Sequence, residues 1–128
     1  MDMKRKQFGP LLKEFRLSRR ITLRRFAEMM DIAPSYLSDV ENSRKAPFTE
    51  KNMEKAIALL GLSREEEREL YDADGVSTGT VARDISSYMN SMQMAQLAMR
   101  VAEECNATDQ DFQDFINRLQ SKRGNQNG

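Results

Sequence analysis

The sequence predicts an all-α fold, and three observations lead to this prediction. Apolar residues recur at the i, i+3, i+4 spacing of one helix face along most of the 128-residue chain. The three prolines and six glycines lie mostly outside these periodic segments. Between residues 22 and 47, two short helical patterns are separated by only two residues, which is typical of a tight helix pair. The length suits one domain with a genuine core.

The first two helices are predicted over residues 8–18 and 23–30. Pro10 is tolerated only in a first helical turn, so the first helix begins no earlier than Phe8. One stripe of this helix is apolar and holds Phe8, Leu11, Leu12 and Phe15. Thr22 is a suitable N-cap for the second helix. The apolar face of that helix holds Leu23, Phe26, Ala27 and Met30.

A third helix is predicted to begin at Pro34, because proline suits the first helical position. Leu37 and Val40 face inward, whereas Ser35, Tyr36, Ser38 and Asp39 face elsewhere. Only Ile32 and Ala33 connect this helix to the preceding one, so the two helices are expected to cross sharply.

Two further helices follow, over residues 49–60 and 64–73. Gly61 ends the first of them, and Ser63 with Glu66 forms a capping box that begins the second. The run from Gly75 to Thr80 is expected to be a flexible linker. The predicted organisation is therefore a domain over 1–74, a linker over 75–80, a C-terminal helical region over 81–120 and a disordered tail over 121–128.

The C-terminal region carries three apolar faces, the last of them capped by Thr108. They consist of Ile85, Tyr88 and Met89; Met94, Leu97, Ala98 and Val101; and Phe112, Phe115, Ile116 and Leu119. Asn90 with Gln93 suggests a break between the first two. An alternative phase follows a/d heptad spacing over one long helix, through Ile85, Tyr88, Met92, Ala95, Met99 and Ala102. Our hypothesis is that this region forms a homodimer through Ile85, Tyr88, Met92 and Met99; core packing within one chain is the other interpretation.

The segment from Thr22 to Pro47, TLRRFAEMMDIAPSYLSDVENSRKAP, resembles the helix-turn-helix of the lambda-repressor-like (Cro and xenobiotic-response-element type) DNA-binding domains. The likeness extends from about Phe8 to Leu62. It departs from the family where Ala33 replaces a frequent capping Ser or Thr, and where Asp31 replaces a frequent turn glycine. Asp tolerates the left-handed conformation, so the fold is expected to be kept.

The resemblance implies that the helix beginning at Pro34 lies in the DNA major groove. Carried over by position, the base-facing residues are Pro34, Ser35, Tyr36, Ser38 and Asp39. The family also implies a structural ion pair between Arg16 and Glu41. A polar loop beside such a helix commonly supplies phosphate contacts. The phosphate-binding candidates are Thr22, Leu23, Asn42, Ser43, Arg44 and Lys45, and Arg19, Arg20, Arg24 and Arg25 form a second basic cluster.

The charge distribution agrees with a DNA-binding N-terminal half. The net charge is zero, but residues 1–48 hold eleven Lys and Arg against six Asp and Glu, a net of +5. Residues 49–128 hold nine against fourteen, a net of −5. Such asymmetry suits a domain that faces phosphates while the remainder is acidic.

Several other classes of protein are disfavoured. The chain has no histidine, so Ser-His and Cys-His catalytic pairs are impossible, and no glycine-rich phosphate loop is present. We expect no enzymatic activity, no metal and no cofactor. The single cysteine, Cys105, excludes an internal disulfide. We find neither a secretory signal nor a run of 18 apolar residues, so we expect a cytoplasmic protein without a membrane span.

The function predicted from these features is that of a sequence-specific regulator of transcription. It would bind double-stranded DNA as a homodimer and act as a repressor. A second class of function stays open, in which the protein is an antitoxin or adaptor. Its C-terminal helices would then bind a protein partner, and DNA binding would be secondary.

Overall fold

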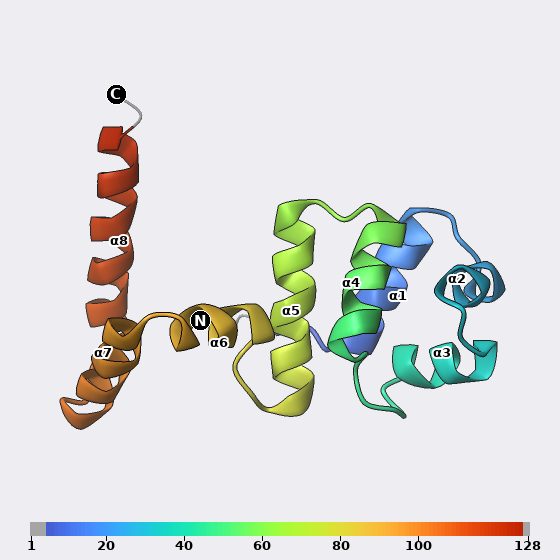
Figure 1. The fold of residues 1–128 in the computed structure, drawn as a ribbon, viewed down its shortest axis with the longest axis horizontal. Coiled ribbons are helices and arrows are strands. Elements are labelled where there is room, and N and C mark those ends of the chain that lie inside the picture. The colour runs from blue at the N-terminus through green and yellow to red at the C-terminus, as the bar shows by residue number, and fades with distance from the viewer. Residues whose placement is uncertain (1–4, 127–128) are drawn as a thin grey trace. The chain divides into compact units, whose positions relative to one another are not determined.

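A computed structural model describes residues 5–126 of the chain, and over this range the fold contains eight α-helices and no strand (Figure 1). The helices are α1 (Phe8–Ser18), α2 (Leu23–Met30), α3 (Pro34–Glu41), α4 (Glu50–Leu60), α5 (Arg64–Thr78), α6 (Arg83–Asn90), α7 (Gln93–Glu104) and α8 (Asp109–Gln126). The all-α prediction is confirmed. The chain forms two compact units, one extending to Ser87 and the other beginning at Tyr88.

The first unit contains the hydrophobic core. Every buried apolar side chain in the described range lies between Phe8 and Ala82. Helix α1 packs against α3 and α5, and α2 packs against α3 and α4. The stripe expected on α1 is fully in this core, as are Phe26, Ala27 and Met30 of α2. Helical periodicity in the sequence thus predicted which faces of α1 and α2 are buried.

The ends of α2, α4 and α5 follow from capping chemistry. Thr22 Oγ1 accepts a hydrogen bond from the Arg25 backbone N–H at 3.1 Å, and Ser63 forms a capping box with Glu66. Asp31 adopts the left-handed conformation at φ 58°, as does Gly61 at φ 60°. Both residues therefore stop a helix in the way predicted from the sequence.

The expected linker over 75–80 is wrong, because α5 continues to Thr78. Gly75 is buried, and a Cβ at this position would lie 2.7 Å from the Thr80 carbonyl oxygen. Glycine is thus required here for close packing rather than for flexibility. Ser77 Oγ accepts a hydrogen bond from the Phe8 N–H at 2.8 Å, so the last turn of α5 also satisfies the free start of α1.

The first unit also extends beyond the expected boundary at residue 74. Arg83, at the start of α6, donates from Nε and Nη2 to the two carboxylate oxygens of Asp74, both at 2.9 Å. Its Nη2 also donates to the Phe48 carbonyl at 2.6 Å. Hydrogen bonds to the buried Asp74 raise the pKa of the Arg83 guanidinium. These bonds fasten the beginning of α6 to the domain.

The second unit consists of the end of α6, α7 and α8. Residues 91–92 separate α6 from α7, and the Ser91 hydroxyl donates to the Tyr88 carbonyl at 2.6 Å. The single long helix considered as an alternative is therefore wrong, because this turn competes with helix continuation. The expected disordered tail is corrected as well, since α8 includes residues 121–126; residues 127–128 lie outside the described range.

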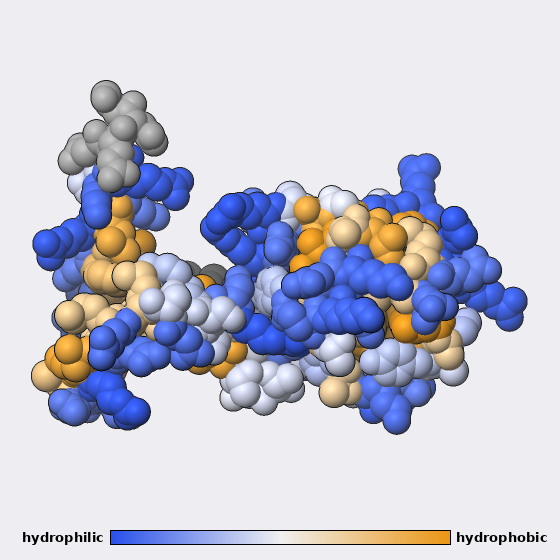
Figure 2. Space-filling model, viewed as in Figure 1, coloured by the Kyte–Doolittle hydropathy of each residue, from blue (hydrophilic) through white to orange (hydrophobic). Residues whose placement is uncertain are grey.

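The second unit has no interior of its own. None of residues 88–124 is buried, and the unit displays large apolar side chains along α7 and α8 (Figure 2). Within the described range, no helix combines the length and the apolar character needed to cross a membrane.

Candidate nucleic-acid interface

The turn between α2 and α3 holds the two helices in a fixed relation. Asp31 reverses the chain in its left-handed conformation, and the Ile32 N–H donates to the Ala27 carbonyl at 3.0 Å. Ile32 is half-buried and packs against the core. Pro34 starts α3 at the first helical position, although Ala33 provides no side-chain cap. The start of α3 is therefore fixed by proline and by packing.

Arg16 and Glu41 form a buried ion pair that joins α1 to the end of α3. Arg16 Nε donates to Glu41 Oε2 at 2.7 Å, and Nη2 donates to Glu41 Oε1 at 2.9 Å. Arg16 Nη1 donates to the Ile21 carbonyl at 2.8 Å. The two residues are only 4% and 3% exposed. This bidentate geometry restricts the orientation of α3 on the domain.

Gly9 allows α1 to approach the end of α3 closely. A Cβ at Gly9 would lie 2.3 Å from the Val40 carbonyl oxygen and 2.7 Å from that of Glu41. Both contacts are to backbone atoms, which cannot move aside cheaply. A glycine at residue 9 is therefore part of the geometry that positions α3, and the sequence contained no periodic signal for it.

The base-facing candidates differ in how far the fold exposes them. Pro34 and Ser35 are exposed at the start of α3, while Ser38 and Asp39 are half-buried. Tyr36 is also half-buried, because its ring packs on Phe48 with centroids 6.4 Å apart. Pro34 and Ser35 therefore form the most open part of α3, whereas part of Tyr36 supports the core.

The loop after α3 is held by the carbonyl of Asp39. This carbonyl accepts from the Arg44 N–H at 2.7 Å and from the Lys45 N–H at 3.2 Å. Arg44 Nη1 lies 3.7 Å from Asp39 Oδ1 in an exposed ion pair. Ser43 reverses the chain at φ 61°. The Asn42 side chain donates back to the Ser38 carbonyl at 2.9 Å.

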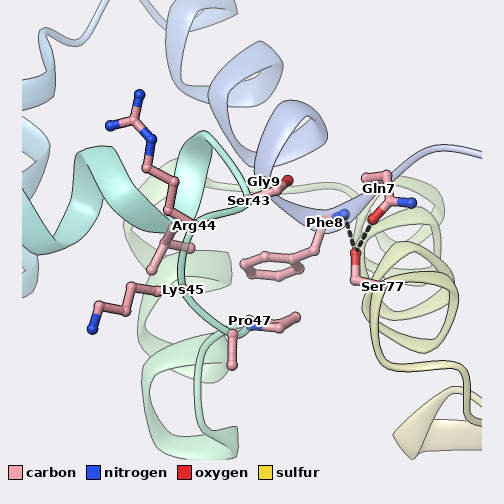
Figure 3. A pocket seen from close by; sticks show the side chains of 10 residues that line it. Gln7, Phe8, Gly9, Ser43, Arg44, Lys45, Pro47 and Ser77 are labelled. Atoms are coloured by element: carbon pink, nitrogen blue, oxygen red, sulfur yellow. Dashed lines mark hydrogen bonds between the residues drawn. The ribbon is translucent and has the colours of Figure 1, made fainter.

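A pocket of about 260 Å³ lies behind this loop, against the start of α1. Figure 3 shows Gln7 and Ser77 hydrogen-bonded at one side of it, while Arg44 and Lys45 extend away from it. Both cations are exposed. Their charged groups are therefore available to anions outside the pocket, next to the open part of α3.

The other phosphate candidates lie at the start of α2. Thr22 is exposed and Leu23 is half-buried. The Thr22 side chain is occupied by its cap hydrogen bond, so the free donors at this point are the first backbone N–H groups of α2. Such N–H groups at a helix start favour anions.

The basic cluster at residues 19–25 does not act as one surface. Arg19 Nε donates to the Leu60 carbonyl at 2.8 Å, and its Nη1 and Nη2 donate to Glu66 at 3.1 and 2.8 Å. These hydrogen bonds, together with one from the Ser63 backbone, lower the pKa of Glu66 to about 2. Arg19 is therefore a structural residue, whereas Arg20, Arg24 and Arg25 are exposed.

The four residues expected at a dimer interface do not form one continuous stripe. Ile85, Tyr88, Met92 and Met99 are all exposed, but residues 91–92 interrupt the helix between Tyr88 and Met99. The long-helix interface built on heptad spacing is therefore corrected. The apolar faces expected for separate α7 and α8 helices are both exposed and remain candidates for association.

Comparison with known proteins finds one family match, and it includes the candidate interface. A family model for helix-turn-helix domains matches residues 12–66. One solved structure, titled "SinR protein/SinI protein complex", is similar to this chain at 19% identity and a TM-score of 0.48. That similarity covers 92% of this chain and 99% of the other. No curated protein sequence matches.

Proposed function

We propose, from the match of residues 12–66 to a helix-turn-helix family model, that this segment is a lambda-repressor-like DNA-binding domain and that the protein is a regulator of transcription. The protein binds double-stranded DNA as a homodimer, reads its sequence through α3 in the major groove, and represses transcription by occupying an operator.

The observation that carries this proposal is the open start of α3 beside an exposed basic loop. Pro34 and Ser35 are exposed at the start of the helix, and Arg44 and Lys45 are exposed just beyond its end. The Arg16–Glu41 pair fixes this helix on the domain. A rigid helix flanked by cations is the arrangement that groove binding requires.

The side chains of α3 can recognise bases through different kinds of hydrogen bond. The Ser35 and Ser38 hydroxyls can donate to or accept from base edges, and the Asp39 carboxylate can accept from the amino group of cytosine. Tyr36 contributes from its unburied edge. Because short side chains dominate this surface, DNA shape also contributes to specificity.

We assign phosphate binding to the loop after α3 and to the start of α2. Arg44 and Lys45 supply exposed cations, and Thr22 and Leu23 lie where the first backbone N–H groups of α2 are free. Asn42 and Ser43 shape the loop and offer polar groups beside these cations. Such contacts set the register on DNA without reading sequence.

Binding to DNA at increasing salt tests the phosphate assignment. For Arg44→Ala and for Lys45→Ala, we expect weaker binding to all duplexes and a slope of log K against log salt that is lower by about one. Arg68→Ala, which removes an exposed arginine of α5, is the matched control and should leave the slope unchanged. An unchanged slope in both loop variants would remove them from the phosphate contacts.

Selection of binding sites from a random DNA pool tests the reading helix. We expect the wild type to select a two-fold symmetric site with half-sites about 34–36 Å apart. Ser35→Ala and Asp39→Asn should change the preferred bases while leaving the salt slope close to that of the wild type. A wild-type protein that selects no sequence would contradict the proposal.

A second function is favoured by the exposed apolar faces of α7 and α8. An antitoxin or adaptor would bind its protein partner through such faces, with DNA binding secondary. Stoichiometric copurification of a second polypeptide with the native protein, together with weak DNA binding, would favour this alternative.

A further inference from the structure

The loop between α3 and α4 is open along most of its length. Its residues from Asn42 to Ala46 are exposed, and a pocket of about 260 Å³ lies behind it. The Asp39 carbonyl holds the first half of the loop, because it accepts from the Arg44 and Lys45 N–H groups. The second half needs an attachment of its own, since exposed backbone without hydrogen bonds opens easily.

Arg83 provides this attachment from the first turn of α6. Its Nη2 donates to the Phe48 carbonyl at 2.6 Å. Within the described part of the chain, this is the only hydrogen bond made by Ala46, Pro47 or Phe48. The Phe48 ring is buried and packs on Phe8, with ring centroids 5.6 Å apart. The ring contact holds the side chain of Phe48, and the bond from Arg83 holds its peptide group.

A rigid support holds the Arg83 guanidinium in turn. Its Nε and Nη2 donate to the two carboxylate oxygens of Asp74, both at 2.9 Å. Asp74 is only 2% exposed, and among the described residues these oxygens accept from Arg83 alone. The chain turns back closely onto α5, because a Cβ at Gly75 would lie 2.7 Å from the Thr80 carbonyl oxygen. This close turn brings Arg83 beside Asp74.

We propose that Arg83 is a positioning residue for DNA binding, which holds the Phe48 end of the α3–α4 loop and thereby places Arg44 and Lys45 against the DNA phosphates. The inference rests on the proposed function and adds a residue to it. Asp74 and Arg83 both lie after residue 66, where the match to the helix-turn-helix family model ends. The unit that binds DNA therefore includes the turn after α5 and the start of α6.

A purely structural role for Arg83 would be to neutralise the buried Asp74. Two variants separate the two roles. D74N keeps Arg83, and the side-chain oxygen at residue 74 can still accept from it. D74N/R83M removes the guanidinium as well, and it leaves neither an unpaired buried charge nor a change in net charge. If neutralisation is the only role, D74N/R83M should bind DNA like the wild type.

Binding to a random-sequence duplex distinguishes these roles in full-length variants that circular dichroism shows to be folded. We expect D74N to bind with close to wild-type affinity and D74N/R83M to bind about tenfold more weakly. The slope of log K against log salt should be lower by about one in D74N/R83M. Arg44→Ala should weaken binding less in D74N/R83M than in the wild type, because the phosphate contact that it removes is already impaired.

The matched control is R19M/E66Q. Arg19 also joins a carboxylate, that of Glu66, to a backbone carbonyl, that of Leu60, but it does not contact the α3–α4 loop. This variant likewise leaves the net charge unchanged. It should lower stability, and its effect on DNA affinity should simply add to that of Arg44→Ala.

Amide hydrogen exchange gives a readout of the loop that needs no DNA. The Arg44 and Lys45 N–H groups should exchange at close to the wild-type rate in D74N and faster in D74N/R83M, while the amides of α2 keep their protection. The inference is overturned if D74N/R83M matches the wild type in either DNA affinity or loop exchange. A wild-type protein that binds no DNA would overturn the proposed function, and with it the role of Arg83 in DNA binding. Normal DNA binding by D74N/R83M, beside a wild type that binds, would overturn only the positioning role.

Discussion

The buried Arg16–Glu41 pair has a strong but asymmetric effect on stability. In Arg16→Met, the Glu41 carboxylate stays buried without its partner, and in Glu41→Leu the same is true of the guanidinium. We expect each single variant to lose about 3–5 kcal/mol of unfolding free energy. The double variant should lose less than the sum, because it leaves no unpaired buried charge.

Urea unfolding of the three variants measures this difference. Lys6→Ala is the control, since it removes an exposed ion pair to Glu14 that is 3.3 Å long. Such a pair is worth about 0–1 kcal/mol. If Arg16→Met costs no more than Lys6→Ala, the pair does not hold α3 in place.

The Glu66 carboxylate predicts a pH dependence of stability. Hydrogen bonds from Arg19, and then from the Ser63 backbone, lower its pKa from 4.5 to about 2. Because the folded-state pKa is the lower one, the stabilisation is complete above about pH 4.5 and is lost as the pH falls toward 2. The unfolding free energy of Glu66→Gln should therefore be below that of the wild type at pH 6 to 7, and the difference should shrink on acidification.

A matched glutamate on the same helix controls for general acid effects. Glu69 is exposed on α5 and forms no ion pair within the described part of the chain. Glu69→Gln should leave the pH profile of the unfolding free energy parallel to that of the wild type. If Glu66→Gln and Glu69→Gln behave alike, the Arg19 hydrogen bonds do not stabilise the fold.

At the scale of helices, the sequence predicted most of α1 to α4 because local chemistry defines their ends. Pro10, Thr22, Pro34 and Gly61 each act within one turn of the boundary that they set. The end of α5 was not predictable in this way. Gly75 is typical of a linker by composition, but contacts with Thr80 and Ala82 bury it inside a helix. Local propensity does not contain that information.

In the candidate interface, too, features set by local sequence were predictable and features set by tertiary contacts were not. The exposure of Pro34 and Ser35 follows from the inward periodicity of Leu37 and Val40, which the sequence contains. The Arg16–Glu41 pair joins residues 25 apart in sequence, and only the family resemblance implied it. The packing of Tyr36 on Phe48 and the use of Arg19 as a structural residue depend on tertiary contacts, so no local pattern indicated them.

The close crossing of α1 and α3 gives a prediction at this scale. In Gly9→Ala, the added Cβ must push against the backbone carbonyls of Val40 and Glu41. We expect a loss of about 1–3 kcal/mol in unfolding free energy, as for overpacking in a core, and weaker DNA binding because α3 is displaced. Gly124→Ala is the control, since its Cβ meets no atom within 4 Å. Equal stability of both variants would show that the crossing has room for a methyl group.

For the molecule as a whole, the two units differ in what holds them folded. The first unit has a continuous core, to which Phe8, Phe26, Phe48 and Leu70 all contribute. The second has no buried side chain among residues 88–124. Short helices without a covered apolar face are marginal in water. If α7 and α8 are stabilised by a second copy, their stability must depend on protein concentration, whereas that of the first unit must not.

Thermal unfolding followed by far-ultraviolet circular dichroism at two protein concentrations tests this coupling. We expect two transitions, of which only the one for α7 and α8 moves to higher temperature at the higher concentration. A tenfold increase in concentration favours a dimer by about 1.4 kcal/mol, which is enough to separate the curves. A single transition that is independent of concentration would mean that the α7–α8 unit is stabilised within one chain.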